Sequence, residues 1–441
     1  MDGYPWWLLW GPVLRCPGWL TLPEPVTSGL RASSNRSTAG HLAVDEDLMV
    51  SELSFDVAIV GAGVAGLMLA MKISRLGFTV ALIEKEERLA AGPSTRNEGW
   101  LHAGTYHATS ISDHQEAICV ARRCIYGFKQ IRRYAPEAVE EPGTPAFALV
   151  MNRDRITEIR SRWAEAGVSN TQVNLLKLAS LMPELKLNSI QAAFQVRDVG
   201  INTRILYRKL LTDSQRAGAK VFVNTDLSFD DTGLANLVFS DFKMSLKSNI
   251  FIYTSGYNMA SIFQTHHGIS VPIRYWKSHL AITPRLSKYS VFCLDPGEAA
   301  MMNHGSCSVV GLNEDALLCE SPDLDHMPEQ FDKVNEAITR LYSSTDRRLH
   351  VPVACIKADI SNKNESFNGL VGADARSLGV KVFEPRPGHL CALPGKMTET
   401  PYLTDILTQL IYNKLTDNDI ALRPLDKFSS NTLQSSNNLG I

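Results

Sequence analysis

The stretch FDVAIVGAGVAGLMLAMKISRLGFTVALIEK, residues 55–85, decides the fold of this chain. Residues 56–60 are a short apolar run suited to a buried parallel strand. The glycine-rich turn at residues 61–66 opens an amphipathic helix, and a second apolar run then ends on Glu84. A strand, a glycine-rich turn, a helix and a strand ending on an acid are typical of a dinucleotide-binding unit in a doubly wound α/β domain.

Each glycine of this turn has a separate role. Gly61 allows the tight turn, Gly63 lets the backbone approach a pyrophosphate, and Gly66 lets helix and strand pack closely. The helix N-terminus points its free N–H groups at the phosphates. Glu84 is placed to bind a ribose hydroxyl, and we count the adjacent Lys85 with it as cofactor-binding. The alternative is a glycine-rich turn of a doubly wound domain that binds no nucleotide.

Composition narrows the class of protein. The chain has 441 residues, 44% of them apolar, which is enough for two domains with substantial cores. Its net charge of −2 offers no basic face for nucleic acid. The eight cysteines have no C-x-x-C spacing and are typical of reduced thiols in a cytoplasmic compartment. The histidines lack the supporting ligands of a metal site, so we expect none.

The two ends of the chain differ from the rest. Residues 1–48 combine a short tryptophan-rich run with a serine-rich stretch, and Met49 precedes the first strand. We therefore expect a disordered extension, with a targeting peptide as the alternative. Residues 417–441 are polar, and we expect a loose tail. The sequence shows no membrane span.

Periodicity predicts the remaining elements. Helices are expected at residues 115–134, 155–166, 204–217, 328–342 and 400–415. Strands are expected at residues 220–223, 250–253, 271–283, 291–294 and 308–312, and a turn at residues 388–395. The strand at 250–253 ends at a small-residue turn containing Gly256, which should lie near the dinucleotide because ligands bind at the carboxyl ends of such strands.

These elements predict a Rossmann-like dinucleotide-binding domain with an α+β substrate domain inserted in two pieces and built on an antiparallel sheet. The boundaries we expect for the first domain are residues 53–135, 198–265 and 368–416. Those for the substrate domain are residues 136–197 and 266–367. A single dinucleotide unit favours an enzyme that takes electrons from its organic substrate, because flavoproteins reduced by nicotinamide commonly carry a second unit.

Two further segments carry a family resemblance. Residues 97–106, NEGWLHAGTY, are similar to a pattern of asparagine, small residue, glycine, two apolar residues, histidine, small residue and glycine. Residues 396–401, KMTETP, look like a carboxyl-terminal flavin segment. Over residues 55–415 the chain resembles the D-amino-acid oxidase superfamily of FAD enzymes, closest to its L-2-hydroxyglutarate dehydrogenase and its glycine and sarcosine oxidase branches.

The resemblance implies the cofactor and its contacts. Gly395 stands where some sarcosine oxidases carry the cysteine of a covalent flavin, which implies noncovalent FAD. Lys396, with the positive end of the following helix, would lie by flavin N1 and the C2 carbonyl and stabilise the reduced flavin. Met397 and Thr398 would complete this segment. The alternative for Lys396 is a solvated turn lysine.

The loop at residues 91–107, which contains the first of these segments, has functional candidates of its own. Its mixture of glycine and polar residues is typical of loops that carry function. Arg96 is a candidate for the flavin diphosphate or for an ordinary ion pair, and Asn97 is counted with the cofactor site. His102 is a candidate base or substrate hydrogen-bonder, and the alternative is a histidine that only braces the flavin ring.

A substrate carboxylate would require a cation on the second sheet. Arg274 and Lys277 are the candidates, on opposite faces of one strand because side chains alternate. The alternative is an edge strand protected by charge.

The sequence thus predicts an FAD-dependent oxidoreductase that oxidises a small amino acid or 2-hydroxy acid by hydride transfer to flavin N5. One rival is an NAD-dependent dehydrogenase. The other is an FAD-binding protein with a lapsed catalytic site that serves as an interaction module.

Overall fold

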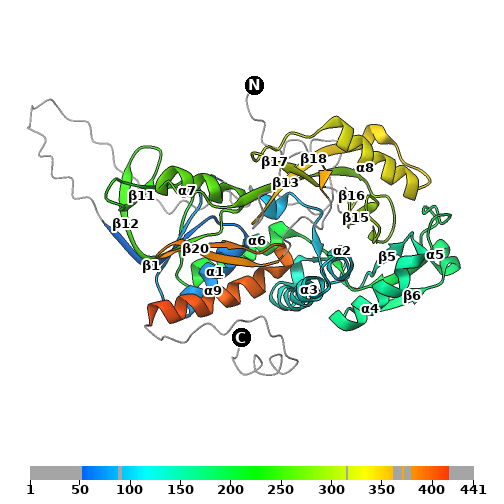
Figure 1. The fold of residues 1–441 in the computed structure, drawn as a ribbon, viewed down its shortest axis with the longest axis horizontal. Helices are drawn as coiled ribbons and strands as arrows, with labels where there is room; N and C mark the ends of the chain where they lie inside the picture. Colours follow the sequence, from blue (N-terminus) through cyan, green and yellow to red (C-terminus); the bar gives the residue numbers. More distant parts are fainter. Residues whose placement is uncertain (1–51, 88–91, 314–315, 361–369, 372–378, 417–441) are drawn as a thin grey trace, which may run out of the picture.

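The computed structural model describes residues 52–87, 92–313, 316–360, 370–371 and 379–416. The predictions for residues 1–48 and for the tail at 417–441 lie outside these ranges. Two large sheets dominate the described part of the chain (Figure 1). A small three-stranded sheet is formed by segments of the chain that connect them.

The first sheet is eight-stranded in the described residues and carries the dinucleotide motif. Its order is β10-β11-β12-β1-β2-β9, and β21 pairs with both β12 and β20. The bounds are β1 (Leu53–Val60), β2 (Val80–Ile83), β9 (Lys220–Phe222), β10 (Asp226–Phe229), β11 (Ala235–Val238), β12 (Lys243–Tyr253), β20 (Lys381–Arg386) and β21 (His389–Leu393). Strands β21, β12, β1, β2 and β9 run parallel.

Both faces of this sheet are buried at β2 and at the carboxyl-terminal halves of β1 and β12, which explains why these stretches are continuous apolar runs. Val57 and Ile59 pack on α1 (Val64–Arg75), α6 (Thr203–Arg216) and α9 (Thr400–Leu415). Ala58 and Val60, on the other face, share a core with α7 (Met259–His267). The predicted doubly wound α/β fold is confirmed.

The turn predicted at residues 388–395 is wrong. The run His389–Leu393 is the buried strand β21, which pairs in parallel with β12. Flanking Gly388 and Gly395 have the positive φ angles of turns, but His389, Leu390 and Cys391 between them pair with β12, far away in the sequence. Pairing with a distant strand overrides the local turn signal.

The second sheet is ten-stranded in the described residues, with order β19-β17-β13-β16-β15-β14-β5-β7-β6 and β18 beside β13. Its pairs are antiparallel except for β5 and β14. The bounds are β5 (Ala146–Val150), β6 (Asn170–Val173), β7 (Ala192–Val196), β13 (Ile273–Pro284), β14 (Val291–Cys293), β15 (Ala299–His304), β16 (Cys307–Leu312), β17 (Ala316–Cys319), β18 (Val351–Ile360) and β19 (Leu370–Val371).

Strands from two separate stretches of the chain therefore meet in one sheet, as an inserted domain requires. The division at the boundaries given above stays a prediction. Helix α8 (Pro328–Leu341) packs on β13, β15 and β16 through a core that includes Val334, Ile338 and Ala281 (Figure 1). The face of β13 that carries Ala281 is thus covered by α8.

The strands of the small sheet lie in the chain segments that run between the two large sheets. Its strands are β3 (Trp100–Leu101), β4 (Val139–Glu140) and β8 (Val199–Ile201). The other elements are α2 (His107–Ser110), α3 (His114–Tyr134), α4 (Ile156–Ala166), α5 (Leu175–Leu181), η2 (Pro93–Thr95), η3 (Pro136–Ala138), η4 (Arg153–Arg155), η5 (Gly256–Asn258), η6 (Arg347–Leu349) and η8 (Met397–Glu399). The helices predicted by periodicity begin and end within one residue of those observed.

Two further findings concern the cysteines and the helices. The seven cysteines that the structure describes are all free thiols. Within the described ranges, no helix combines the length and the apolar character that crossing a bilayer requires.

Candidate cofactor and substrate site

A cavity of about 590 Å³ lies where the two large sheets approach each other. It is bordered by the β1–α1 turn, the end of β2, the loop before β3, η5, the segment that leads into η8, and β18. Its volume is in the range of natural ligand pockets. The predicted dinucleotide segments and one strand of the second sheet therefore share one cavity.

The glycine-rich turn fits a dinucleotide. Gly61 has φ +101°, and a Cβ there would lie 2.8 Å from Ser255 Cα. A Cβ on Gly66 would lie 2.0 Å from the carbonyl oxygen of Gly61, so helix and strand pack too closely for any side chain. Gly63 differs, because its nearest neighbour would be Ser94 Oγ at 3.5 Å, an ordinary contact. The protein itself leaves room at Gly63, and we infer that the bound pyrophosphate needs that room.

The end of β2 is tied to this turn. Glu84 Oε2 accepts a hydrogen bond from the backbone N–H of Ala62 at 2.9 Å, and Tyr207 Oη donates to the Ala62 carbonyl at 2.9 Å. Burial raises the pKa of Glu84 above its ordinary value. Glu84 and the half-exposed Lys85 both border the cavity, as the predicted ribose contact requires.

The loop before β3 is shaped by Asn97. Its Nδ2 donates to the Pro93 carbonyl at 2.9 Å, and its Oδ1 accepts from the Gly99 N–H at 2.8 Å. Asn97 and Arg96 border the cavity, and so does Gly256, the first residue of η5.

His102 follows β3 and faces Asp198, a residue that sequence reasoning did not select. His102 Nδ1 lies 3.5 Å from Asp198 Oδ1, and Asp198 is fully buried. Asp198 also accepts from the Ala103 N–H at 3.0 Å and from the Thr105 hydroxyl. Burial lowers the pKa of His102, although Asp198 opposes this shift. A neutral imidazole whose Nδ1–H faces Asp198 presents an Nε2 lone pair.

The Lys396 segment lies beside His102. Thr398 Oγ1 accepts from the His102 backbone N–H at 3.1 Å, which joins the two segments that carried the family resemblance. A Cβ on Gly127 would lie 1.6 Å from the Thr398 carbonyl oxygen, so α3 packs directly on η8. Gly395, Lys396, Met397 and Thr398 all border the cavity.

Arg274 and Lys277 do not border the cavity, contrary to the expected substrate contact. Arg274 Nε binds Asp359 Oδ1 at 3.1 Å in a buried ion pair. Lys277 lies on the face of β13 that α8 covers, where it binds Asp323 and donates to the Asp325 carbonyl at 3.0 Å. Both cations are engaged by carboxylates of their own sheet or its connections.

Breaking the Arg274–Asp359 ion pair is expected to lower the free energy of unfolding and to leave the cofactor content unchanged. Asp359→Ala leaves a buried guanidinium without its carboxylate, a loss of about 3 to 5 kcal/mol in the free energy of unfolding. Urea denaturation measures this loss. The double variant Arg274→Met with Asp359→Leu is expected to recover most of it, with cofactor content unchanged in both proteins. A single variant as stable as the wild type would contradict this role.

In the described strands of the second sheet, Lys357 of β18 is the cation that borders the cavity. It pairs with Trp276 across the β13–β18 ladder, so it shares the face of Arg274 and Trp276. Glu98, in the loop before β3, also borders the cavity. Burial alone would raise the pKa of Glu98, but the positive charges of Lys357 and Lys396 bring it below its ordinary value. Sequence reasoning selected neither residue.

Comparison with known proteins decides the family. Residues 56–383 match the family described as FAD dependent oxidoreductase. The chain belongs to this family. It is an oxidoreductase whose cofactor is FAD, which rules out the NAD-dependent alternative, and the glycine turn, Glu84 and the cavity fit that cofactor.

Individual relatives are distant. L-2-hydroxyglutarate dehydrogenase from Indibacter alkaliphilus is 24% identical over 230 residues, which are 50% of this chain and 55% of that protein. The chain thus spans about half the length of this curated relative. The mitochondrial L-2-hydroxyglutarate dehydrogenase of Caenorhabditis briggsae is 21% identical over 39% of each chain.

Solved structures share the fold. Glycine oxidase from Geobacillus kaustophilus has a TM-score of 0.62 at 16% identity, covering 82% of this chain and 95% of its own. L-α-glycerophosphate oxidase from Mycoplasma pneumoniae, with FAD bound, has a TM-score of 0.64 at 16% identity, covering 81% and 95%.

Proposed function

We propose that this enzyme binds FAD noncovalently in the cavity and uses it to oxidise a small 2-amino or 2-hydroxy acid. The observation that carries the proposal is that His102, Lys396 and the dinucleotide motif border one cavity. The names of the relatives, a hydroxy-acid dehydrogenase and an amino-acid oxidase, support these two substrate classes.

FAD, when bound, supplies the acceptor for a hydride from the substrate carbon. The chain must then hold that carbon, take up the proton of the substrate heteroatom and stabilise negative charge on the reduced cofactor. His102 Nε2 takes the proton, and the buried Asp198 carboxylate, 3.5 Å from Nδ1, stabilises the imidazolium that forms. Lys396 supplies positive charge beside the cavity.

Gly395 supports a noncovalent cofactor, because the position has no nucleophilic side chain. Acid precipitation of the purified yellow protein should release all of its flavin as FAD into the supernatant. Flavin that stays with the pellet would contradict this part of the proposal.

The pH dependence of substrate oxidation tests the role of His102. Because burial lowers the pKa of His102 below 6.5, the imidazole is neutral and active above that value. We expect kcat/KM to fall with decreasing pH only below pH 6.5, as His102 gains a proton and can no longer act as the base. His102→Asn should slow flavin reduction and remove this acid limb. If kcat/KM of the variant fell at low pH as it does in the wild type, a group other than His102 would be responsible for that fall.

A further inference from the structure

The carboxylate of Glu98 rests on the second sheet, at the substrate side of the cavity. A Cβ on Gly311 of β16 would lie 2.9 Å from Glu98 Oε1, and 2.9 Å from a methyl carbon of Leu280. Only glycine at position 311 leaves room for the carboxylate there. Gly311 pairs with Leu280 across the β13–β16 ladder, and Leu280 shares its face with Trp276 and hence with Lys357.

Glu98 and Lys357 are therefore an anion and a cation on one wall of the cavity. Their charges interact strongly enough for Lys357 to lower the pKa of Glu98. Even so, no ion pair within 4.0 Å joins these two residues, both of which the structure describes. Two opposite charges held apart beside a cavity can each bind one end of a zwitterion.

The backbone of Glu98 is anchored by His304, at the end of β15. His304 Nε2 lies 2.9 Å from the Glu98 carbonyl oxygen, and its Nδ1 contacts the Glu140 carboxylate. Burial would lower the pKa of His304, but Glu140 raises it above the ordinary value. Both partners, a carboxylate and a carbonyl oxygen, are acceptors, which suits a ring that donates from both nitrogens. A Cβ on Gly99 would lie 2.4 Å from His304 Cε1, so the loop and the ring are in close contact.

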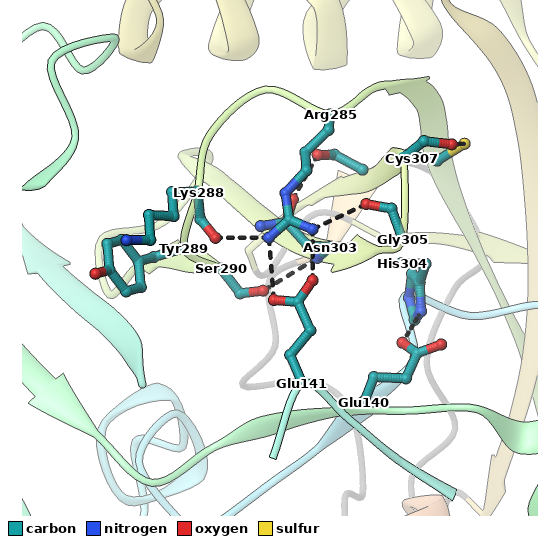
Figure 2. Close-up of polar contacts among 12 residues, drawn as sticks. Glu140, Glu141, Arg285, Lys288, Tyr289, Ser290, Asn303, His304, Gly305 and Cys307 are labelled. Carbon is teal, nitrogen blue, oxygen red and sulfur yellow. Dashed lines mark hydrogen bonds and ion pairs between the residues drawn. The ribbon is translucent and has the colours of Figure 1, made fainter. Parts of the chain in front are cut away.

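The ion pair between Arg285 and Glu141 lies next to the contact between His304 and Glu140 and supports it. Arg285 binds both carboxylate oxygens of Glu141, at 2.5 and 3.0 Å, and donates to the Gly305 carbonyl at 2.8 Å. Figure 2 shows Glu140 and Glu141 side by side, with Glu140 directed at His304 of β15 and Glu141 directed at Arg285, which follows β13. The loop that carries Glu98 is thus fixed to the substrate-side sheet, as a selective site requires.

We propose that Glu98 and Lys357 form a two-charge subsite that selects a zwitterionic 2-amino acid over the corresponding 2-hydroxy acid. Lys357 binds the substrate carboxylate and Glu98 binds the α-ammonium group. This inference rests on the proposed function and narrows it to one of its two substrate classes.

The charges of the reaction favour the same choice. The α-ammonium gives one proton to His102 Nε2, and the Cα–H hydrogen then leaves with both bonding electrons to FAD. FAD is reduced, the substrate is oxidised to an iminium ion, and the carboxylate of Glu98 stabilises that cation. A hydroxy acid has no cation to offer, and negative charge would develop on its oxygen beside Glu98.

Two compounds without a Cα–H bond test binding apart from chemistry. 2-Aminoisobutyrate and 2-hydroxyisobutyrate differ only in the amino or hydroxyl group, and neither can transfer a hydride. Each is titrated into the FAD-loaded enzyme by calorimetry. We expect the wild type to bind the amino compound more tightly. Glu98→Gln should weaken the binding of the amino compound by about ten- to a hundredfold. The binding of the hydroxy compound should be unchanged or tighter.

Lys357→Met is the matched variant, because both compounds carry the carboxylate. Lys357→Met should weaken the binding of both compounds by a similar factor, whereas Glu98→Gln should weaken the binding of the amino compound alone. Unchanged flavin content and melting temperature would show that each variant is folded. Tighter binding of the hydroxy compound by the wild type, failure of the amino compound to bind, or equal effects of Glu98→Gln on both would each overturn the inference. Oxidation of a hydroxy acid alongside such a result would leave the proposed function standing.

Discussion

Gly63→Val is expected to abolish FAD binding while the apoprotein stays folded. Gly63 has φ −68° and ψ 179°, which any residue adopts, and the nearest atom to an added Cβ is 3.5 Å away. Valine therefore fits the protein, but its methyl groups would enter the cavity where the pyrophosphate must approach the backbone. Flavin content after purification and the free energy of unfolding of the apoprotein measure the two effects separately.

Gly66→Val is the contrasting variant in the same turn. Its Cβ would overlap the Gly61 carbonyl at 2.0 Å, so we expect loss of FAD together with about 3 kcal/mol or more of stability. Arg75→Val, at the exposed end of α1, controls for valine in this helix and should change neither quantity much. If Gly63→Val kept its flavin, the pyrophosphate would not lie at Gly63.

Lys396→Met is expected to keep FAD but to destabilise its reduced form. Removing a positive charge from a site with little water disfavours the anion that forms on reduction. A single charged hydrogen bond contributes about 1 to 3 kcal/mol, which lowers the two-electron midpoint potential by about 20 to 65 mV. Spectroelectrochemical titration measures the potential, and substrate reduction should slow with it.

Two variants separate this effect from others. Lys85→Met removes the same charge beside Glu84, where we expect the ribose, and should leave the potential unchanged. His102→Ala should slow reduction with little change in potential, since His102 acts on the substrate proton. An unchanged potential in Lys396→Met would make Lys396 an ordinary turn lysine.

Local patterns in the sequence indicated many of the residues that border the cavity. The β1–α1–β2 unit reads directly from residues 55–85, because the glycine spacing and the apolar periods are local properties. The predicted cofactor residues, except Gly66, border the cavity, and Gly66 packs behind the turn. The segments around His102 and Lys396 were visible only through the resemblance, since nothing local indicates that Thr398 binds the His102 backbone.

The substrate side depends on tertiary structure and was harder to predict. Which face of β13 meets the cavity follows from the position of α8 and from the β13–β18 register, and neither is encoded near Arg274 or Lys277. Lys357 lies far in the sequence from Glu98, and Asp198 lies far in the sequence from His102. Glu98 did offer a signal, because it occupies a position where the resemblance pattern has a small residue.

Anaerobic mixing of the purified enzyme with single 2-amino and 2-hydroxy acids tests the central claim most directly. The account predicts that the yellow protein loses its visible flavin absorbance with at least one such acid, without any nicotinamide, and that His102→Ala slows this bleaching. Dithionite serves as the control for a reducible flavin. A flavin that dithionite reduces but no member of the panel does would contradict the account and favour a protein with a lapsed catalytic site.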